Sequence, residues 1–329
     1  MPRTLHAQHD RFVLSRPFRI ARGAKTAADV ITVTIDEDGV SGRGEGVPYP
    51  RYGESVESAL AQVEEARSAI EAGAGRETLL RLLAPGAARN ALDCALWDLE
   101  ARRSGHDVSS MLGLPPPKAL VTAFTIVIDT PEAMAEAARE ASGSPLLKIK
   151  LDRDDAAARI RAVRAAAPEA ALIVDPNESW DRQLVESIQP VLQEAGVALL
   201  EQPVPAGEDG WLEGFAPAIP ICADESVHIA ADLAKIGGRY QAINVKLDKA
   251  GGLTAALDLA HAARARGLAL MTGCMVCSSL SIAPALHVAA ISDFVDLDGP
   301  LWLREDRAGG VSGRPGALAP PESGFWGSA

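Results

Sequence analysis

The sequence lacks the features of several protein classes. Only four of its 329 residues are cysteine, which is too few for a disulfide scaffold and favours a reducing cytoplasm. Its six histidines show no spacing typical of a zinc site. No apolar run approaches the roughly 18 residues that a membrane span needs, and the first residues contain no signal-peptide core. We therefore expect a cytoplasmic protein with no membrane partner.

Positive charge is also in short supply. The chain has 32 Lys and Arg against 44 Asp and Glu, which gives a formal net charge of −12. This balance argues against a nucleic-acid partner and is typical of a solubilising acidic surface. The hydrophobic content of 47% and the charged content of 23% are those of an ordinary soluble globular protein.

Residues 1–114 are organised differently from the rest of the chain. Strand-like runs come first and amphipathic helical patterns follow, an order that indicates a small α+β domain. The strand-like runs cover 11–20 and 30–36, and the helical patterns cover 54–72 and 86–104. Three prolines at 115–117 mark the predicted boundary. The Gly- and Pro-rich segment 300–329 is expected to pack back on this first domain.

From 115 to 299 apolar runs alternate with helical segments. Short runs of this kind, each followed by a helix, are typical of buried parallel strands in βα units. Eight candidate strands therefore predict a TIM-like barrel that carries the active site. Their positions are 122–128, the five runs that end at 150, 175, 201, 224 and 246, then 268–273 and 293–299.

Five of these runs end at a polar residue, and the spacing between them barely changes. The residues are Lys150, Asp175, Glu201, Asp224 and Lys246, separated by 25, 26, 23 and 22 residues. Polar groups at strand ends would lie on one rim of a barrel, where such barrels carry their chemistry. Three carboxylates there could hold a hard divalent cation such as Mg²⁺. A single acid after a strand could equally cap a helix or turn the chain, but three at matching positions are hard to explain that way.

Lysines flank the three acids in sequence. Lys148 and Lys150 alternate along one strand, so both point to the same face, here the barrel interior. Lys246 lies four strands further round, roughly opposite Lys150. A buried lysine near cations has a lowered pKa and can act as a base. The alternative is that each lysine merely pairs with a nearby acid.

Further candidates could contact a substrate. Asp296 and Asp298 share a face of the last strand and could bind a second metal or an ammonium group, or else form a turn before Gly299-Pro300. Arg22 and Lys25 belong to a basic loop that could face the site or simply be solvated.

Several motifs together resemble those of the enolase superfamily. They are K-x-K at 148–150, DPNESW from Asp175, EQP from Glu201, ADES from Ala223 and KLDKAGGLT from Lys246. The closer likeness is to the muconate-lactonizing subgroup. The Asp296-Leu297-Asp298 motif resembles that of its dipeptide epimerases, in particular the L-Ala-D/L-Glu epimerases. Segments 16–23, 48–55 and 86–103 are similar to that group too.

The resemblance implies a fold and an activity. The fold would be a modified (β/α)₇β barrel with an N-terminal α+β capping domain whose loops close over the site. The activity would be epimerisation of a dipeptide, in which the α-proton of the C-terminal residue is removed and returned through an enediolate. A role in recycling cell-wall peptides is implied as well. The oligomeric state, including a homo-oligomer, is left open.

The resemblance also implies a role for each candidate residue. Asp175, Glu201 and Asp224 would hold one Mg²⁺ per subunit, and Lys150 and Lys246 would be the acid/base catalysts on opposite faces. The remaining candidates would position or bind the substrate: Lys148 beside the metal ligands, Asp296 and Asp298 at the dipeptide ammonium group, Arg22 or Lys25 at the side-chain carboxylate, and Thr125 in the first barrel strand.

The nearest alternatives are other enzymes on the same scaffold, namely an o-succinylbenzoate synthase, an N-succinylamino acid racemase or a cycloisomerase. Their substrates lack a free ammonium group, so the inward pair Asp296 and Asp298 would have no partner. A catalytically silent metal- or ligand-binding barrel would keep the carboxylates but has no reason to keep both Lys150 and Lys246. A purely structural protein explains none of these residues.

Overall fold

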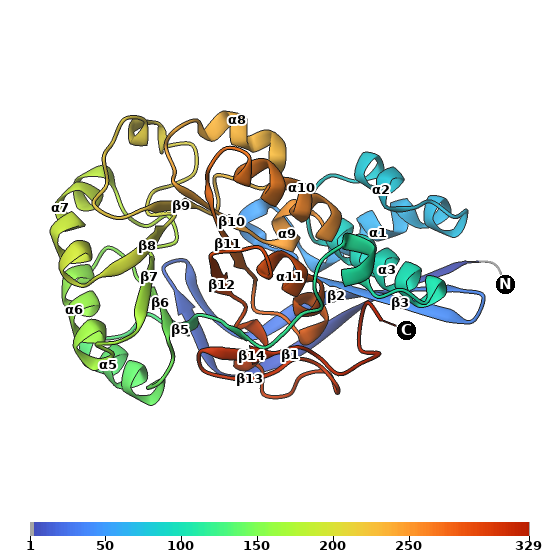
Figure 1. Cartoon of the computed structure of the whole chain (residues 1–329), viewed down its shortest axis with the longest axis horizontal. Coiled ribbons are helices and arrows are strands. Elements are labelled where there is room, and N and C mark those ends of the chain that lie inside the picture. The colour runs from blue at the N-terminus through green and yellow to red at the C-terminus, as the bar shows by residue number, and fades with distance from the viewer. Residues whose placement is uncertain (1–2, 329) are drawn as a thin grey trace.

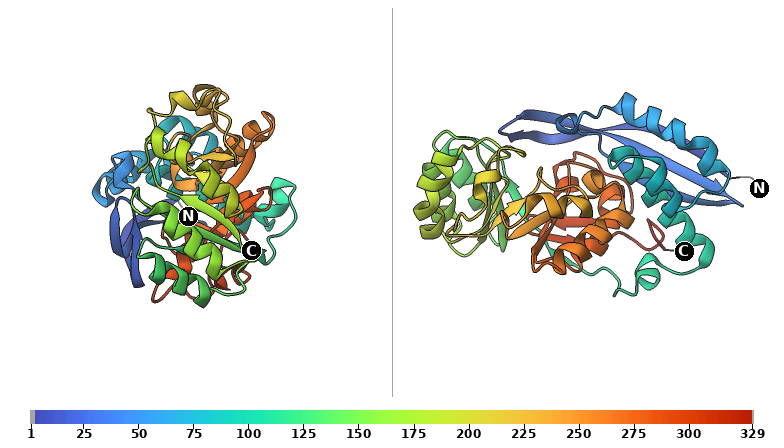
Figure 2. Two further views of the ribbon diagram at one scale, coloured as in Figure 1. Left: turned by 90° about the vertical axis from the view of Figure 1, so that its left-hand side faces the viewer. Right: turned by 90° about the horizontal axis from the view of Figure 1, so that it is seen from above.

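The computed structural model describes residues 3–328 and contains an eight-stranded parallel sheet and an antiparallel N-terminal sheet. In Figure 1 the parallel sheet occupies the centre and left, and the N-terminal elements extend to the right. Seen from above in Figure 2 (right), β1 and β2 run along one side of the barrel, and their linked ends reach over it. The expected fold, a TIM-like barrel with an α+β cap, is confirmed.

The N-terminal unit consists of a three-stranded sheet covered by helices. The strands are β1 (Thr4–Ile20), β2 (Gly23–Glu37) and β3 (Val40–Gly46), and the helices are α1 (Val56–Glu71), α2 (Arg76–Leu82) and α3 (Ala87–Ser104). The sheet is antiparallel in the order β1-β2-β3. Both predicted strands lie inside longer ones, and both predicted helices match to within two residues. Ser55 and Ser58 form the capping box that starts α1.

Glycines in β3 allow α3 to lie directly on the strand. A Cβ atom on Gly44 would lie 2.0 Å from the carbonyl oxygen of Ala91, and one on Gly46 would lie 2.1 Å from that of Ala87. Any larger residue would push the helix away, because packed interiors do not absorb an extra methyl group at such distances. This close packing brings the next part of α3, including Asn90 and Asp93, against the loop that follows the barrel strand of Lys246.

Eight parallel strands form the barrel in chain order. They are β5 (Phe124–Ile126), β6 (Leu146–Lys150), β7 (Ala171–Asp175), β8 (Val197–Glu201), β9 (Ile221–Ala223), β10 (Ala242–Val245), β11 (Ala269–Gly273) and β12 (Phe294–Asp296). The Ala123 N–H donates to the carbonyl oxygen of Val295 at 2.8 Å, which joins the first strand to the last. All eight candidate strands are therefore present.

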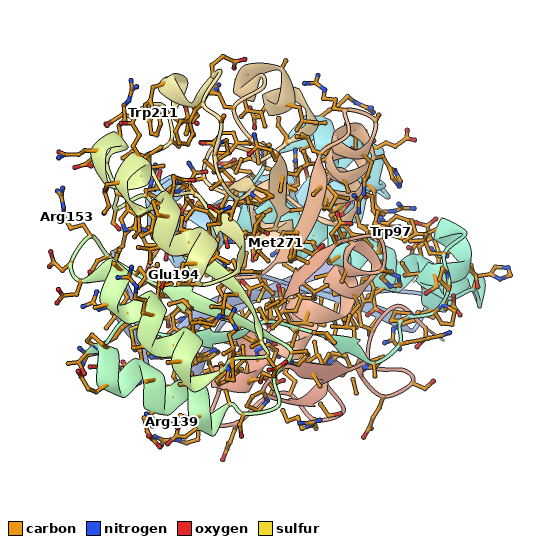
Figure 3. The ribbon with its side chains drawn as sticks, turned by 60° about the vertical axis from the view of Figure 1, so that its left-hand side comes forward. Trp97, Arg139, Arg153, Glu194, Trp211 and Met271 are labelled. Atoms are coloured by element: carbon orange, nitrogen blue, oxygen red, sulfur yellow. The ribbon has the colours of Figure 1, made fainter. Side chains whose placement is uncertain are left out.

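Helices cover the outside of the barrel. They are α5 (Pro131–Glu140), α6 (Ala156–Ala166), α7 (Arg182–Glu194), α8 (Leu233–Ile236), α9 (Leu247–Ala250), α10 (Leu253–Arg264) and α11 (Ser279–Ala289), and only the 3₁₀ helix η2 (Gly210–Leu212) follows β8. In Figure 3, Arg139 and Arg153 point away from this helical layer, whereas Met271 of β11 lies near the centre. Met271 is completely buried, as expected inside a packed barrel.

The C-terminal segment contacts both parts of the chain. Strands β13 (Ser312–Arg314) and β14 (Ala317–Ala319) form a small sheet with β4 (Leu120–Val121), which follows α4 (Val108–Leu112). Further on, the indole N–H of Trp326 donates to the carbonyl oxygen of Arg43 at 3.0 Å. The domain boundaries at 114 and 299 stay a prediction. Within residues 3–328 no helix combines the length and apolar character that crossing a membrane requires.

Candidate active site

A cavity of about 510 Å³ lies between the carboxyl ends of the barrel strands and the linked ends of β1 and β2. Nine predicted site residues line it: Arg22, Lys25, Thr125, Lys148, Lys150, Asp224, Lys246, Asp296 and Asp298. Asp175 and Glu201 are fully buried next to this lining. The apolar side chains of Phe18 and Ile20, from β1, close part of the cavity. The structure therefore brings all the predicted site residues together.

Each lysine of the rim is held by a carboxylate. The Nζ atom of Lys150 lies 2.5 Å from Oδ2 of Asp175, its register partner on the next strand. On the other side of the barrel, Nζ of Lys246 lies 2.7 Å from Oδ2 of Asp224. Because β6 and β10 are four strands apart in the sheet order, these two pairs face each other across the cavity.

Lys148 forms the centre of a buried ionic cluster. Its Nζ atom lies 2.7 Å from Glu201, 2.7 Å from Asp296 and 3.1 Å from Asp175. Burial would lower the pKa of Lys148, but these three carboxylates outweigh it and hold the pKa well above the usual value. Such a charge is tolerated inside a protein because it is paired on several sides.

The expected pKa shift of the second catalytic lysine is wrong for this structure. Burial would lower the pKa of Lys246, but the carboxylates of Asp224 and Glu201 outweigh it and raise the pKa. Burial would likewise raise the pKa of Asp224, which its lysine partners instead hold well below the usual range. The prediction assumed a cation beside the lysine, whereas the charges that dominate here are the carboxylates themselves.

The acids Asp175, Glu201 and Asp224 offer the hard oxygen ligands that Mg²⁺ prefers. Buried Oε2 of Glu201 and Oδ1 of Asp224 accept no hydrogen bond, although each lies 2.7 Å from a lysine Nζ atom. As placed, no three His, Cys, Asp or Glu side chains among residues 3–328 converge so that they could hold a metal ion. The residues present fit a divalent cation by charge and ligand type, and binding requires the lysine ammonium groups to give up some of these oxygens.

A second acidic pair lies at the end of β12. Oδ2 of Asp298 accepts hydrogen bonds from the backbone N–H of Thr125 at 2.8 Å and from the indole N–H of Trp302 at 3.1 Å. Burial and the neighbouring charge of Asp296 raise the pKa of Asp298 to about 6. Oδ1 of Asp296 is buried and accepts no hydrogen bond. A cationic group of a ligand would satisfy both acids.

The two cations of the cap loop differ in their surroundings. The guanidinium group of Arg22 donates to Glu225 at 2.8 Å, to Glu178 at 3.2 Å and to the carbonyl oxygen of Asn177 at 3.0 Å. Lys25 forms no ion pair within residues 3–328, and its Nζ atom lies 4.8 Å from the ring centre of Tyr49. Arg22 is therefore fully engaged with the barrel, whereas Lys25 has charge to offer a ligand.

Some residues of the site were missed by the sequence reasoning. Glu225 is buried between Arg22 and the metal-ligand candidates, and burial raises its pKa to about 8. Lys249 contacts Asp224 from behind. The one available signal was their place in the motifs, since Glu225 directly follows Asp224 and Lys249 comes three residues after Lys246.

Comparisons with known proteins cover nearly the whole chain. Residues 3–113 match the family described as mandelate racemase / muconate lactonizing enzyme, N-terminal domain, and residues 132–321 match the family described as enolase C-terminal domain-like. The L-Ala-D/L-Glu epimerase of Escherichia coli K12 is 48% identical over 92% of this chain and 95% of its own. The N-acetyl-D-glutamate racemase of a Pseudoalteromonas species is 44% identical over 91% of this chain and 96% of its own.

A solved structure is similar over its full length. It is an enolase family member from Agrobacterium tumefaciens with homology to dipeptide epimerases, described with bound sodium, L-Ala-L-Glu and an ordered loop. It is 48% identical to this chain and superposes with a TM-score of 0.96, covering 99% of this chain and 100% of its own.

Proposed function

The chain belongs to the mandelate racemase/muconate lactonizing enzyme family of the enolase superfamily, and from this premise we propose that it is a dipeptide epimerase that interconverts L-Ala-L-Glu and L-Ala-D-Glu. The observation that carries the proposal is the pair of buried lysines, Lys150 and Lys246, on opposite sides of one cavity. Two proton-transfer groups on opposite faces of a carbon atom invert its configuration. The identity to an L-Ala-D/L-Glu epimerase and the acidic pair on β12 support this choice of substrate.

The reaction removes a very weakly acidic proton. Loss of the α-proton next to a carboxylate places a second negative charge on the same small group. Asp175, Glu201 and Asp224 would hold one divalent cation, Mg²⁺, at this carboxylate, in line with the lysine and Mg²⁺ pairing known for the enolase superfamily. The ion would supply positive charge that stabilises the developing anion by several kcal/mol.

Lys150 and Lys246 move the proton. One lysine, in its neutral form, takes the α-proton from one face of the glutamate residue, and the ammonium group of the other returns a proton to the opposite face. General acid/base catalysis of this kind contributes on the order of 10²–10⁴-fold to a rate. The roles exchange when the other epimer is the substrate, so that one site runs the reaction in both directions.

The acids on β12 would recognise the free N-terminus of the dipeptide. An ammonium group beside Asp296 and Asp298 would supply the positive charge that the raised pKa of Asp298 shows to be lacking there. It would also give a hydrogen bond to the buried Oδ1 of Asp296. Thr125 contributes through its backbone N–H, which holds Asp298 in place.

Racemisation of an N-acylated glutamate is the second candidate, because the N-acetyl-D-glutamate racemase is nearly as similar as the epimerase. An acylated amine carries no positive charge, so it would leave two buried acids without a partner. We therefore expect faster turnover of L-Ala-L-Glu than of N-acetyl- or N-succinyl-L-glutamate, measured by proton NMR with Mg²⁺ present. A reversed order would replace the dipeptide by the acylated amino acid.

The cap loop would select the glutamate side chain through Lys25. Arg22 already contacts Glu225 and Glu178, whereas Lys25 lines the cavity without an acidic partner in the described chain. We expect Lys25→Met to raise KM for L-Ala-L-Glu about tenfold, since a charged hydrogen bond contributes roughly 1.5–3 kcal/mol. Turnover of L-Ala-L-Met, which has no side-chain charge, should change little.

Arg22→Met is the matched control for this prediction. Loss of its contacts to the barrel loosens the loop, so activity toward both dipeptides should fall together. Steady-state kinetics with the two substrates separate the effects. If Arg22→Met removes the preference for glutamate and Lys25→Met does not, then Arg22 is the specificity residue.

A further inference from the structure

Lys249 is a buried lysine for which the mechanism above has no use. It lies in α9, and its side chain has 0% exposure. Its Nζ atom donates to the carbonyl oxygens of Asp224 at 2.5 Å, Val227 at 2.9 Å and Asn244 at 2.9 Å. The same atom lies 2.7 Å from Oδ1 of Asp224. An ammonium group is costly to bury, and such complete pairing offsets that cost.

These contacts tie together three segments around Asp224. Asp224 and Val227 follow β9, Asn244 belongs to the neighbouring strand β10, and Lys249 itself lies one helical turn after Lys246. The backbone N–H of Lys249 also donates to the carbonyl oxygen of Lys246 at 3.1 Å. The position of one side chain therefore fixes the ends of both strands that carry this half of the site.

Asp224 divides its two oxygens between two lysines. Oδ1 lies 2.7 Å from Nζ of Lys249, and Oδ2 lies 2.7 Å from Nζ of Lys246. Because Lys249 occupies the first oxygen, the carboxylate is held in the orientation that presents the second one to Lys246. Without Lys249 the freed oxygen would compete for the ammonium group of Lys246, and the carboxylate could rotate.

The same arrangement occurs on the opposite side of the cavity. There Asp175 lies 2.5 Å from the catalytic candidate Lys150 and 3.1 Å from Lys148, whose side chain is 1% exposed. Each proposed catalytic lysine thus contacts an acid that a second, buried lysine also contacts. The sequence predicts the first of these sets, because Lys148 and Lys150 alternate on one strand, but not the second.

We propose that Lys249 is a positioning residue, which orients Asp224 and through it places Lys246 against its face of the substrate. The inference rests on the proposed epimerase function. It predicts an asymmetric defect: loss of Lys249 should impair proton removal by Lys246 more than proton removal by Lys150. A lysine that only stabilises the fold would affect both directions alike.

The test compares solvent-deuterium exchange at the glutamate α-carbon of L-Ala-L-Glu and of L-Ala-D-Glu. Lys249→Met is expected to change the ratio of the two initial exchange rates at least about tenfold, toward the pattern of Lys246→Ala, since small misplacements of a catalytic group have large effects. The ratio does not depend on how much of the variant is folded. Lys235→Met, at an exposed lysine of α8, should leave the ratio unchanged.

Equal loss in both directions, or an unchanged ratio, would overturn the inference. If Lys249→Met does not fold, Lys249→Gln keeps two N–H donors for the carbonyl oxygens without the charge, and the same ratio decides. Failure of the proposed function is a separate result, because in that case the unmodified protein exchanges neither epimer.

Discussion

Replacing either Lys150 or Lys246 by alanine is expected to abolish epimerisation and to leave α-proton exchange in only one of the two epimers. Each lysine serves one face of the α-carbon, so the remaining lysine can still remove the proton that points toward it. Loss of a general acid/base should lower the epimerisation rate at least about 100-fold. Proton NMR in D₂O follows exchange and conversion in the same sample.

The two variants should lose complementary activities. Lys150→Ala and Lys246→Ala are expected to retain exchange in opposite epimers, which assigns each lysine to its face. Lys235→Ala, on the exposed surface of α8, is a suitable control and should keep full activity. Full epimerisation in either active-site variant, or exchange of both epimers in one of them, would contradict the two-base mechanism.

Removing divalent cations is expected to have the second largest effect. Chelation by EDTA should lower the rate of α-proton exchange in both epimers by about a thousandfold, which corresponds to the loss of roughly 4 kcal/mol of stabilisation. Added Mg²⁺ should restore the rate. Both directions should be affected equally, because the negative charge that develops on the substrate is the same.

Glu201→Gln locates this effect within the chain. Glu201 is completely buried, and its oxygens face Lys148 and the side-chain amide of Asn244. The amide has nearly the same shape but no charge, so Mg²⁺ binding measured by calorimetry should weaken strongly. Glu194→Gln, at an exposed acid of α7 labelled in Figure 3, should bind Mg²⁺ normally. Unchanged Mg²⁺ affinity in Glu201→Gln would place the cation elsewhere.

The barrel could be predicted from the sequence because its strands are buried on both faces. Continuous apolar runs that end in a polar residue identify both the strand and its rim position, as Leu146–Lys150 and Ala171–Asp175 illustrate. The regular spacing of such ends placed Asp175, Glu201 and Asp224 on neighbouring strands. The pairing of Lys150 with Asp175 follows from the strand register that the structure has.

Other properties of the site depend on contacts that sequence patterns do not encode. Lys249 looks like an ordinary surface lysine of a short helix, and its burial results from carbonyl oxygens 22 and 25 residues away in the chain. The raised pKa of Lys246 depends on which charge lies nearest, and this was not visible from spacing. The sequence likewise named Arg22 and Lys25 together, whereas Glu225 engages only Arg22.

The most direct test of the account is the fate of the α-proton during the first turnovers of the unmodified protein in D₂O. With L-Ala-L-Glu and Mg²⁺, two bases on opposite faces predict that newly formed L-Ala-D-Glu carries deuterium at the glutamate α-carbon, because its proton comes from the second lysine. Product that instead retains the original proton would mean that a single group removes and returns it. That result would contradict the two-lysine mechanism.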